Sequence, residues 1–186
     1  MTSSFDLSFV LGLQHLVASL PWMIPIVIFL ARWLILVEIA LALSLLVFHE
    51  AKKRRATYES AWAAGIALII TSLLSRLFSR PRPFLSHVEV MLLIPPPFNT
   101  SFPSGHTATA VAIACALFGA NKKMGIAAFV LAACIALGRM AAGVHYPSDI
   151  LGGVCVGLVS YGIVRLVRMG LQSKGISLSA ALHRHS

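Results

Sequence analysis

Long apolar stretches alternate with short polar ones along the chain, and their spacing predicts membrane-spanning helices. A helix needs about 20 apolar residues to cross the hydrocarbon core of a bilayer. Five stretches fit this requirement or approach it, namely residues 21–48, 60–79, about 105–120, 124–141 and 150–168. Residues 5–19 are apolar but shorter, so we expect an interfacial helix lying on the membrane, with a sixth span as the alternative. The predicted fold is an all-α, polytopic membrane helix bundle of five to six spans.

The connections between the predicted spans are consistent with one domain. We interpret residues 1–186 as a single integral membrane domain, with an interfacial helix over 1–20 and a cytoplasmic tail over 170–186. Residues 121–123 are the only link between two spans, which predicts a tight hairpin. The N-terminus lacks a basic segment, so we do not predict a cleaved signal peptide.

The composition supports a membrane location. Of the 186 residues 58% are hydrophobic and only 11% are charged, whereas soluble domains carry about 25% charged residues. The mean hydropathy is +0.87. We therefore interpret the net charge of +9 as a signal of topology and expect no nucleic-acid partner. Three cysteines lie inside apolar stretches and are interpreted as packing residues rather than as a disulfide framework.

Most of the 15 Lys and Arg residues fall on one side of the predicted bundle. They lie in segments 49–59, 121–123 and 169–186 or in the helix ends beside them. The positive-inside rule makes this side cytoplasmic. Four arginines on the opposite side break the bias and require another explanation: Arg76, Arg80, Arg82 and Arg139.

Three polar clusters lie at the outer ends of the predicted spans. They are residues 76–84, 103–106 and 138–149. Charged groups at membrane depth are costly and usually functional. A helix bundle can bring all three clusters to one face, where they would combine guanidinium groups, a hydroxyl, two histidines and a carboxylate.

These residue types suit phosphoryl transfer. Arginines supply forked donors for phosphate oxygens, and the helix start at Ser104 and Gly105 attracts anions. Of His106 and His145, one can attack phosphorus while the other protonates the leaving oxygen. Asp149 is placed to accept a hydrogen bond from one of them. No Asp/Glu pair or His/Cys cluster suited to a metal occurs in the sequence, so we expect neither metal nor cofactor.

The combined spacing resembles the type 2 phosphatidic acid phosphatase superfamily, whose soluble relatives include vanadium haloperoxidases. That family has the motifs Lys-x6-Arg-Pro, Pro-Ser-Gly-His and Ser-Arg-x5-His-x3-Asp. The matching residues here are Arg82-Pro83, then Pro103-Ser104-Gly105-His106, then Arg139, His145 and Asp149. The resemblance covers roughly residues 60–165 and implies an acid phosphatase/vanadium haloperoxidase-like core.

The resemblance also implies roles for these residues in a metal-independent reaction. It implies that His145 is the nucleophile, that Asp149 orients it, and that His106 is the general acid. The implied phosphate-binding groups are Arg82, Arg139, Ser104 and Gly105.

The chain departs from the family motifs at two positions. Ser75 occupies the lysine position of the first motif, with Arg76 beside it, and Gly138 stands where the third motif usually has serine. We predict that Arg76 takes part in phosphate binding. Arg32 and Arg80 are candidates for contact with a second phosphate.

The variant first motif and the short chain are most similar to bacterial undecaprenyl-diphosphate phosphatases of this superfamily. The expected reaction is metal-independent hydrolysis of a membrane lipid phosphate or diphosphate through a phosphohistidine intermediate, with undecaprenyl diphosphate converted to undecaprenyl phosphate as the favoured case. The site is expected at the outer face of the bacterial inner (plasma) membrane, towards the periplasm. A phosphatidylglycerophosphate or phosphatidate phosphatase and a lipid phosphotransferase are the enzymatic alternatives. A non-catalytic lipid-binding or transport protein is the alternative from another class, although the sequence shows no repeated halves.

Overall fold

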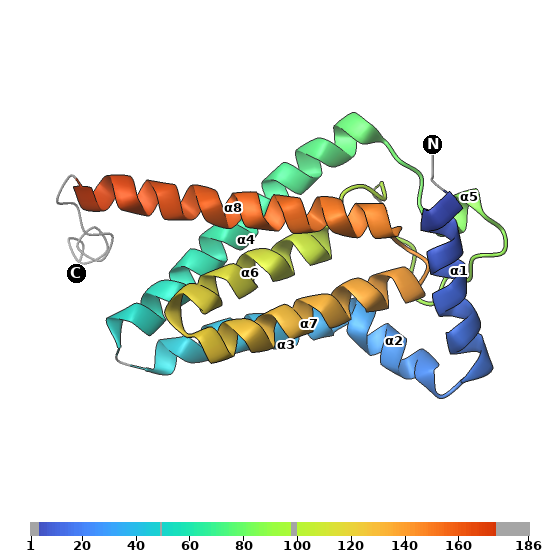
Figure 1. Ribbon diagram of the computed structural model, residues 1–186, viewed down its shortest axis with the longest axis horizontal. Helices are drawn as coiled ribbons and strands as arrows, with labels where there is room; N and C mark the ends of the chain where they lie inside the picture. Colours follow the sequence, from blue (N-terminus) through green and yellow to red (C-terminus); the bar gives the residue numbers. More distant parts are fainter. Residues whose placement is uncertain (1–3, 49, 98–99, 174–186) are drawn as a thin grey trace.

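The protein is an all-helical bundle. The structure is a computed structural model that describes residues 4–48, 50–97 and 100–173. Its α-helices are α1 (Ser4–Ser19), α2 (Met23–Arg32), α3 (Leu34–Ser44), α4 (Ala51–Phe78), α5 (Pro83–Ser86), α6 (Gly105–Ala120), α7 (Lys122–Ala141) and α8 (Pro147–Ser173), with a short 3₁₀ turn η1 (Leu45–Val47) after α3 (Figure 1). Within these residues there is no β-strand, which confirms the predicted all-α class.

Helix α6 forms the core of the bundle. Its residues 107–117 are all buried, and the helix packs against α4, α7 and α8 (Figure 1). The close packing of α8 depends on Gly153 and Gly157. A Cβ atom at these positions would lie 2.7 Å from the carbonyl oxygen of Ser104 and 2.6 Å from that of Ala108, respectively. Small residues thus let the backbones of α6 and α8 approach each other, as is common between membrane helices.

The first predicted span, residues 21–48, is broken rather than straight. Helices α2 and α3 meet at Trp33 with a bend of 50°. The carbonyl of Ala31, whose ordinary helical partner would be the N–H of residue 35, accepts a hydrogen bond from Arg139 Nη1 at 3.1 Å. A side chain that inserts into the helical hydrogen-bond ladder is a recognised cause of such kinks.

Three helical segments are long and apolar enough to cross a membrane, namely Ala51–Ser86, Lys122–Ala141 and Pro147–Ser173. The bent pair α2 and α3 makes a fourth if it forms one span. Helix α6 is apolar but has only 16 residues, a length of about 24 Å. The protein is an integral membrane protein, but the predicted number of five to six spans is not confirmed.

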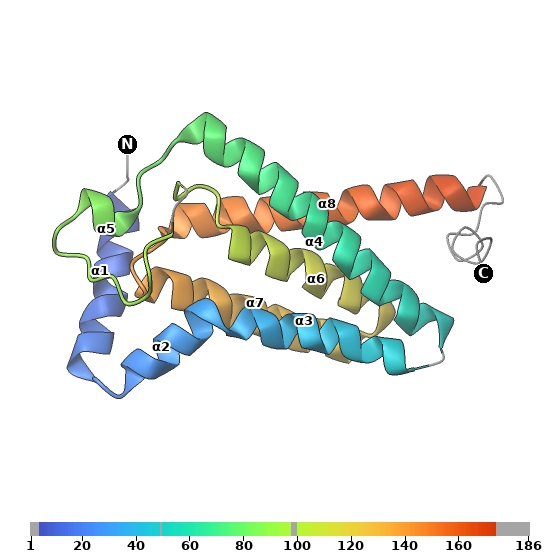
Figure 2. The ribbon, with the colours of Figure 1, turned by 180° about the vertical axis from the view of Figure 1, so that it is seen from behind.

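The two ends of the bundle differ in character. Helix α1 runs crosswise over one end, beside α5 and the turn between α7 and α8 (Figure 2). The opposite end carries the start of α4, the hairpin between α6 and α7, and the end of α8 (Figures 1 and 2). The hairpin is as tight as predicted, because Asn121 alone separates the two helices and caps α7 with its side chain. Most of the predicted tail, residues 170–186, lies outside the described residues.

Candidate active site

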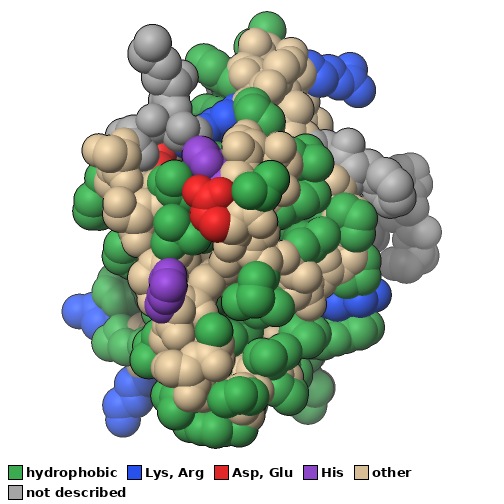
Figure 3. All heavy atoms as spheres, turned by 90° about the vertical axis from the view of Figure 1, so that its right-hand side faces the viewer, with side chains coloured by type: hydrophobic (Ala, Val, Ile, Leu, Met, Phe, Trp, Pro, Cys, Tyr) green, Lys and Arg blue, Asp and Glu red, His purple; other side chains and the backbone are tan. Residues whose placement is uncertain are grey.

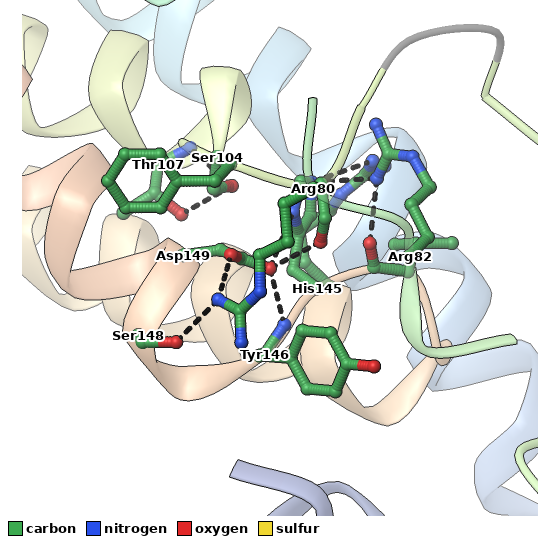
Figure 4. Close-up of polar contacts among 12 residues, drawn as sticks. Arg80, Arg82, Ser104, Thr107, His145, Tyr146, Ser148 and Asp149 are labelled. Carbon is green, nitrogen blue, oxygen red and sulfur yellow. Dashed lines mark hydrogen bonds and ion pairs between the residues drawn. The ribbon is translucent and has the colours of Figure 1, made fainter. Parts of the chain in front are cut away.

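The buried imidazole of His145 is the centre of the candidate site. His145 lies in the turn between α7 and α8 and is 2% exposed. Arg139 reaches it from the last turn of α7, and Arg82 comes from the segment just before α5. The chain therefore brings parts of the first and third motifs together (Figure 4).

Two guanidinium groups face the same ring nitrogen of His145. Arg82 Nη1 lies 3.2 Å and Arg139 Nη2 3.5 Å from His145 Nε2. A guanidinium can only donate, so we assign the lone pair of the neutral ring to Nε2 and its proton to Nδ1. Nε2 therefore carries the lone pair of the ring and faces two groups that match phosphate oxygens.

Main-chain carbonyl groups hold both guanidinium groups in place. Arg82 Nη1 donates to the Val144 carbonyl at 2.7 Å, and Arg139 Nη1 donates to the Ala31 carbonyl at 3.1 Å. Both arginines are buried. Because carbonyl groups carry no net charge, these bonds fix the direction of the two cations without neutralising them.

Burial and neighbouring charge keep His145 neutral. Burial lowers the pKa of His145 to about 4, Arg139 and Arg82 lower it as well, and Asp149 acts in the opposite direction. At pH 7 the site therefore holds an uncharged imidazole beside the protonated side chain of Arg82.

Asp149 lies on the other side of the imidazole, although farther away than expected. Its Oδ2 is 3.7 Å from His145 Nδ1, which is longer than a hydrogen bond. The carboxylate is held by other partners: Oδ2 accepts from the Ser101 hydroxyl and from the Tyr146 N–H at 2.8 Å, and Oδ1 accepts from Arg80 at 2.6 Å. Asp149 thus lies near Nδ1 without a hydrogen bond to it, and three donors set the position of the carboxylate.

Ser104 is buried at the start of α6 and serves as its N-cap. Its hydroxyl oxygen accepts from the Thr107 hydroxyl at 3.0 Å, and its own N–H donates to the Asp149 carbonyl at 3.0 Å (Figure 4). A Cβ added to Gly105 would meet only the methyl group of Thr71, at an ordinary 3.6 Å. Packing within the protein therefore does not require glycine here.

His106 belongs to the same cluster. It lies in the first turn of α6, is partly exposed, and is within electrostatic range of Arg139, His145 and Arg82. This places two imidazoles and two guanidinium groups at one end of the bundle. Across the described residues, no three His, Cys, Asp or Glu side chains gather as metal ligands would.

The other predicted arginines occupy different positions. Arg76 is exposed in the last turn of α4 and shares an open groove with Arg82. Arg80 contacts two carboxylates, Asp149 at 2.6 Å and Asp6 at 2.8 Å. Arg32 is exposed, and its guanidinium carbon lies 5.0 Å from the centre of the Trp33 ring.

A groove lies beside Arg82 on the side of α4. Its lining combines cations, hydroxyl groups and an exposed leucine: Ser72, Ser75, Arg76, Ser79, Arg80, Pro81, Arg82, Leu85 and Thr100. Viewed from the end that carries α1, the surface is mostly hydrophobic side chains and backbone, an acidic side chain and two histidines show among them, and Lys and Arg side chains show mostly at the margins (Figure 3). The groove beside α4 thus reaches Arg80 and Arg82.

Comparison with known proteins identifies the family. Residues 56–171 match the profile of the PAP2 superfamily. The chain belongs to the PAP2 superfamily. It is 30% identical over 134 residues to undecaprenyl-diphosphatase BcrC of Bacillus subtilis, covering 72% of this chain and 69% of that protein. It is 33% identical over 142 residues to putative undecaprenyl-diphosphatase YbjG of Escherichia coli, covering 76% and 71%.

A solved structure shows the same fold. The crystal structure of Aquifex aeolicus LpxE superposes with a TM-score of 0.73 at 26% identity, over 87% of this chain and 95% of that chain. The protein is therefore an integral membrane lipid phosphatase of the PAP2 superfamily.

The departure from the PAP2 pattern at Gly138 has a packing reason. A Cβ at this position would lie 2.7 Å from Leu30 Cβ and 2.8 Å from the backbone nitrogen of Ala31. The backbone of α7 thus contacts α2 at the residue before Arg139, which is why Arg139 can reach the Ala31 carbonyl. The serine of the family motif does not fit between these helices.

The other departure is also explained locally. Ser75, which stands at the lysine position of the first PAP2 motif, ties α4 to the loop that precedes α6. Its hydroxyl donates to the Phe102 carbonyl at 3.2 Å, and its carbonyl accepts from the Thr100 hydroxyl at 3.0 Å. Arg76, the next residue, faces the groove.

Sequence reasoning missed four residues that surround the PAP2 site. Ser101, Tyr146 and Ser148 flank the motif residues, and their contacts depend on how separate loops meet. Asp6 is the fourth, and a signal for it existed. It is one of only six acidic residues in the chain and lies in an apolar stretch, where an acid requires a partner.

Proposed function

We propose that the protein hydrolyses a prenyl diphosphate in the membrane, most specifically undecaprenyl diphosphate, to the monophosphate. One observation carries the proposal: the lone pair of His145 Nε2 faces the guanidinium groups of Arg82 and Arg139 at 3.2 and 3.5 Å. A terminal phosphate that enters this gap exchanges those contacts for bonds from the guanidinium N–H groups to its oxygens. Its phosphorus then lies in front of Nε2.

The proposed reaction has two steps. In the first, Nε2 of His145 attacks the terminal phosphorus, the bond to the bridging oxygen breaks, and His106 donates a proton to the departing prenyl monophosphate. In the second, water attacks the phosphohistidine, His106 accepts its proton, and the P–N bond breaks to release inorganic phosphate. Asp149 stabilises the positive charge that the ring carries in the intermediate, while Arg82 and Arg139 stabilise the charge that develops on the phosphate oxygens.

The lateral groove supports a lipid substrate. Its opening beside α4 is bordered by Leu85, and Leu77 and Phe78 at the end of α4 are exposed. A prenyl tail can therefore remain in the bilayer while its headgroup reaches Arg82. Arg76 at the groove supplies a cation for the second phosphate, which favours a diphosphate. The names of BcrC and YbjG point to the same class of substrate.

The charge distribution supports an active site on the outer face of a bacterial inner membrane. The starts of α4 and α7 carry Lys52, Lys53, Arg54, Arg55, Lys122 and Lys123, at the end of the bundle away from α1 and from the turn between α7 and α8. Basic loops favour the cytoplasmic side. The site would then face the periplasm.

Phosphate release by the purified protein in detergent tests the proposal. Undecaprenyl and farnesyl diphosphate are compared with phosphatidate and phosphatidylglycerophosphate, each with EDTA present, in wild type and His145→Ala. We expect the prenyl diphosphates to give the highest kcat/KM, EDTA to have no effect, and His145→Ala to be inactive. A preference for glycerophospholipids would replace the proposed substrate. Activity that disappears with EDTA would contradict the metal-independent reaction.

A further inference from the structure

Helix α1, outside the matched family region, contributes a buried acid to the back of the active site. Asp6 is 4% exposed. Its Oδ2 accepts from Arg80 Nη2 at 2.8 Å and from the Ser148 hydroxyl at 2.6 Å, and its Oδ1 accepts from the Ser148 N–H at 3.1 Å. Burial alone would raise the pKa of Asp6, but the bonds from Ser148 and Arg80 lower it below its ordinary value. The side chain is therefore a carboxylate at neutral pH.

Arg80 connects this acid to the catalytic loop. Its Nη1 donates to Asp149 Oδ1 and to the Ser148 hydroxyl, each at 2.6 Å. Its guanidinium carbon lies 4.3 Å from the centre of the Tyr146 ring. One cation is thus held between two carboxylates and against an aromatic face, as Figure 4 shows for the side of Asp149.

We propose that Asp6 is a positioning residue for the phosphatase reaction and that it acts through Arg80 on Asp149. This inference rests on the proposed function, in which His145 is the nucleophile. Asp6 takes up part of the charge of Arg80, so that Asp149 keeps its negative charge available to the imidazole. Without Asp6, Arg80 would neutralise Asp149 more completely, and the positive ring of the phosphohistidine would lose stabilisation.

A second residue of α1, Gln14, also holds this helix against the rest of the bundle, so the attachment of α1 does not depend on Asp6 alone. Gln14 Nε2 donates to the Met91 carbonyl at 2.6 Å and to the Ala141 carbonyl at 3.2 Å, and Gln14 Oε1 accepts from the Met91 N–H at 2.9 Å. None of these bonds involves the carboxylates or Arg80. Gln14→Leu therefore weakens the packing of α1 without altering the charges behind His145, and it is the matched control.

The test compares kcat and KM of wild type, Asp6→Asn, Asp6→Glu and Gln14→Leu, each corrected for the folded fraction. We expect Asp6→Asn to lower kcat about tenfold, which corresponds to one pKa unit of lost electrostatic stabilisation, with KM changed less than about twofold. Asp6→Glu should restore part of the loss because it restores the charge. Gln14→Leu should lower the melting temperature but keep the kcat of wild type.

A double-mutant cycle determines whether the effect passes through Arg80. In an Arg80→Gln background, Asp6→Asn should change kcat less than about twofold, because the cation that links the two carboxylates is gone. An undiminished loss in that background would overturn the inference. So would a normal kcat in Asp6→Asn, or a loss that Gln14→Leu reproduces.

Each variant is assayed with farnesyl diphosphate and, separately, with dioctanoyl phosphatidate. With two lipids, a failure of the inference about Asp6 can be distinguished from a failure of the proposed diphosphate substrate. The ratio of variant to wild-type kcat should be the same on both, because the network acts on His145 rather than on the lipid. A wild type that prefers phosphatidate would contradict the diphosphate proposal and leave this ratio unchanged.

Discussion

Arg82 and His145 are 63 positions apart in the chain, yet Arg82 Nη1 lies 3.2 Å from His145 Nε2. The same Arg82 nitrogen donates to the carbonyl of Val144 at 2.7 Å. One guanidinium therefore contacts both the imidazole and the turn that carries it. Arg139 approaches the same Nε2 from α7.

Replacing Arg82 should be more damaging than replacing Arg80. We expect Arg82→Ala to lower kcat by about 100-fold or more, the usual effect of removing a donor to a developing negative charge. Arg80→Ala should cost less, because Arg80 contacts Asp6 and Asp149 rather than Nε2. Steady-state phosphate release measures both. Equal, mild losses would show that Arg82 does not bind the transferred phosphate.

Restoring the motif serine at Gly138 should destabilise the protein. The added Cβ would lie 2.7 to 2.9 Å from atoms of Leu30 and Ala31, two of them in the backbone, so the helices must separate at a cost of about 2 kcal/mol. Thermal unfolding in detergent measures the loss. Gly162→Ser in α8 is the control, because nothing lies within 4 Å of its Cβ position. A Gly138→Ser variant as stable as this control would contradict the close packing of α2 and α7.

Stability should fall as the pH is lowered from 6.5 towards 4. Burial lowers the pKa of His145 from 6.5 to about 4. Between these values the unfolded chain binds a proton at residue 145 that the folded protein does not, so acid favours unfolding. The contribution over this range is about 3 kcal/mol. Melting temperatures measured across the range should decline less steeply in His145→Asn than in wild type, whereas His15→Asn, at an exposed position, should keep the wild-type decline.

Arg76 and Arg32 should differ in their effect on diphosphate binding. Arg76 lines the groove beside Arg82, so Arg76→Gln should raise KM for farnesyl diphosphate several-fold, roughly the effect of one lost charged hydrogen bond. Arg32 lies over the ring of Trp33, so Arg32→Gln should change KM less than about twofold. A larger effect at Arg32 would place the second phosphate beside the bend between α2 and α3.

Some features of the site were predictable because they depend on short-range order. The Pro-Ser-Gly-His sequence begins a helix whose N-cap is Ser104, and the spacing from Arg139 to Asp149 places one end of α7 beside the start of α8. Apolar length alone predicted helices at the right places. Apolar length could not predict the break at Trp33. The Arg139 side chain that donates a hydrogen bond to the Ala31 carbonyl comes from a distant part of the chain.

The sequence by itself determined the helical class, the membrane location and the family, and it supplied the candidate residues of a phosphate site. These features follow from hydrophobicity along the chain and from motif spacing. Only the tertiary structure decided that Asp149 bonds to Ser101 and Arg80 while remaining 3.7 Å from His145, and that Asp6 joins it through Arg80. The hydrogen-bond and ion-pair partners of a buried charged group depend on which side chains the packed helices bring close to it. Those partners therefore depend on the positions of all the helices together.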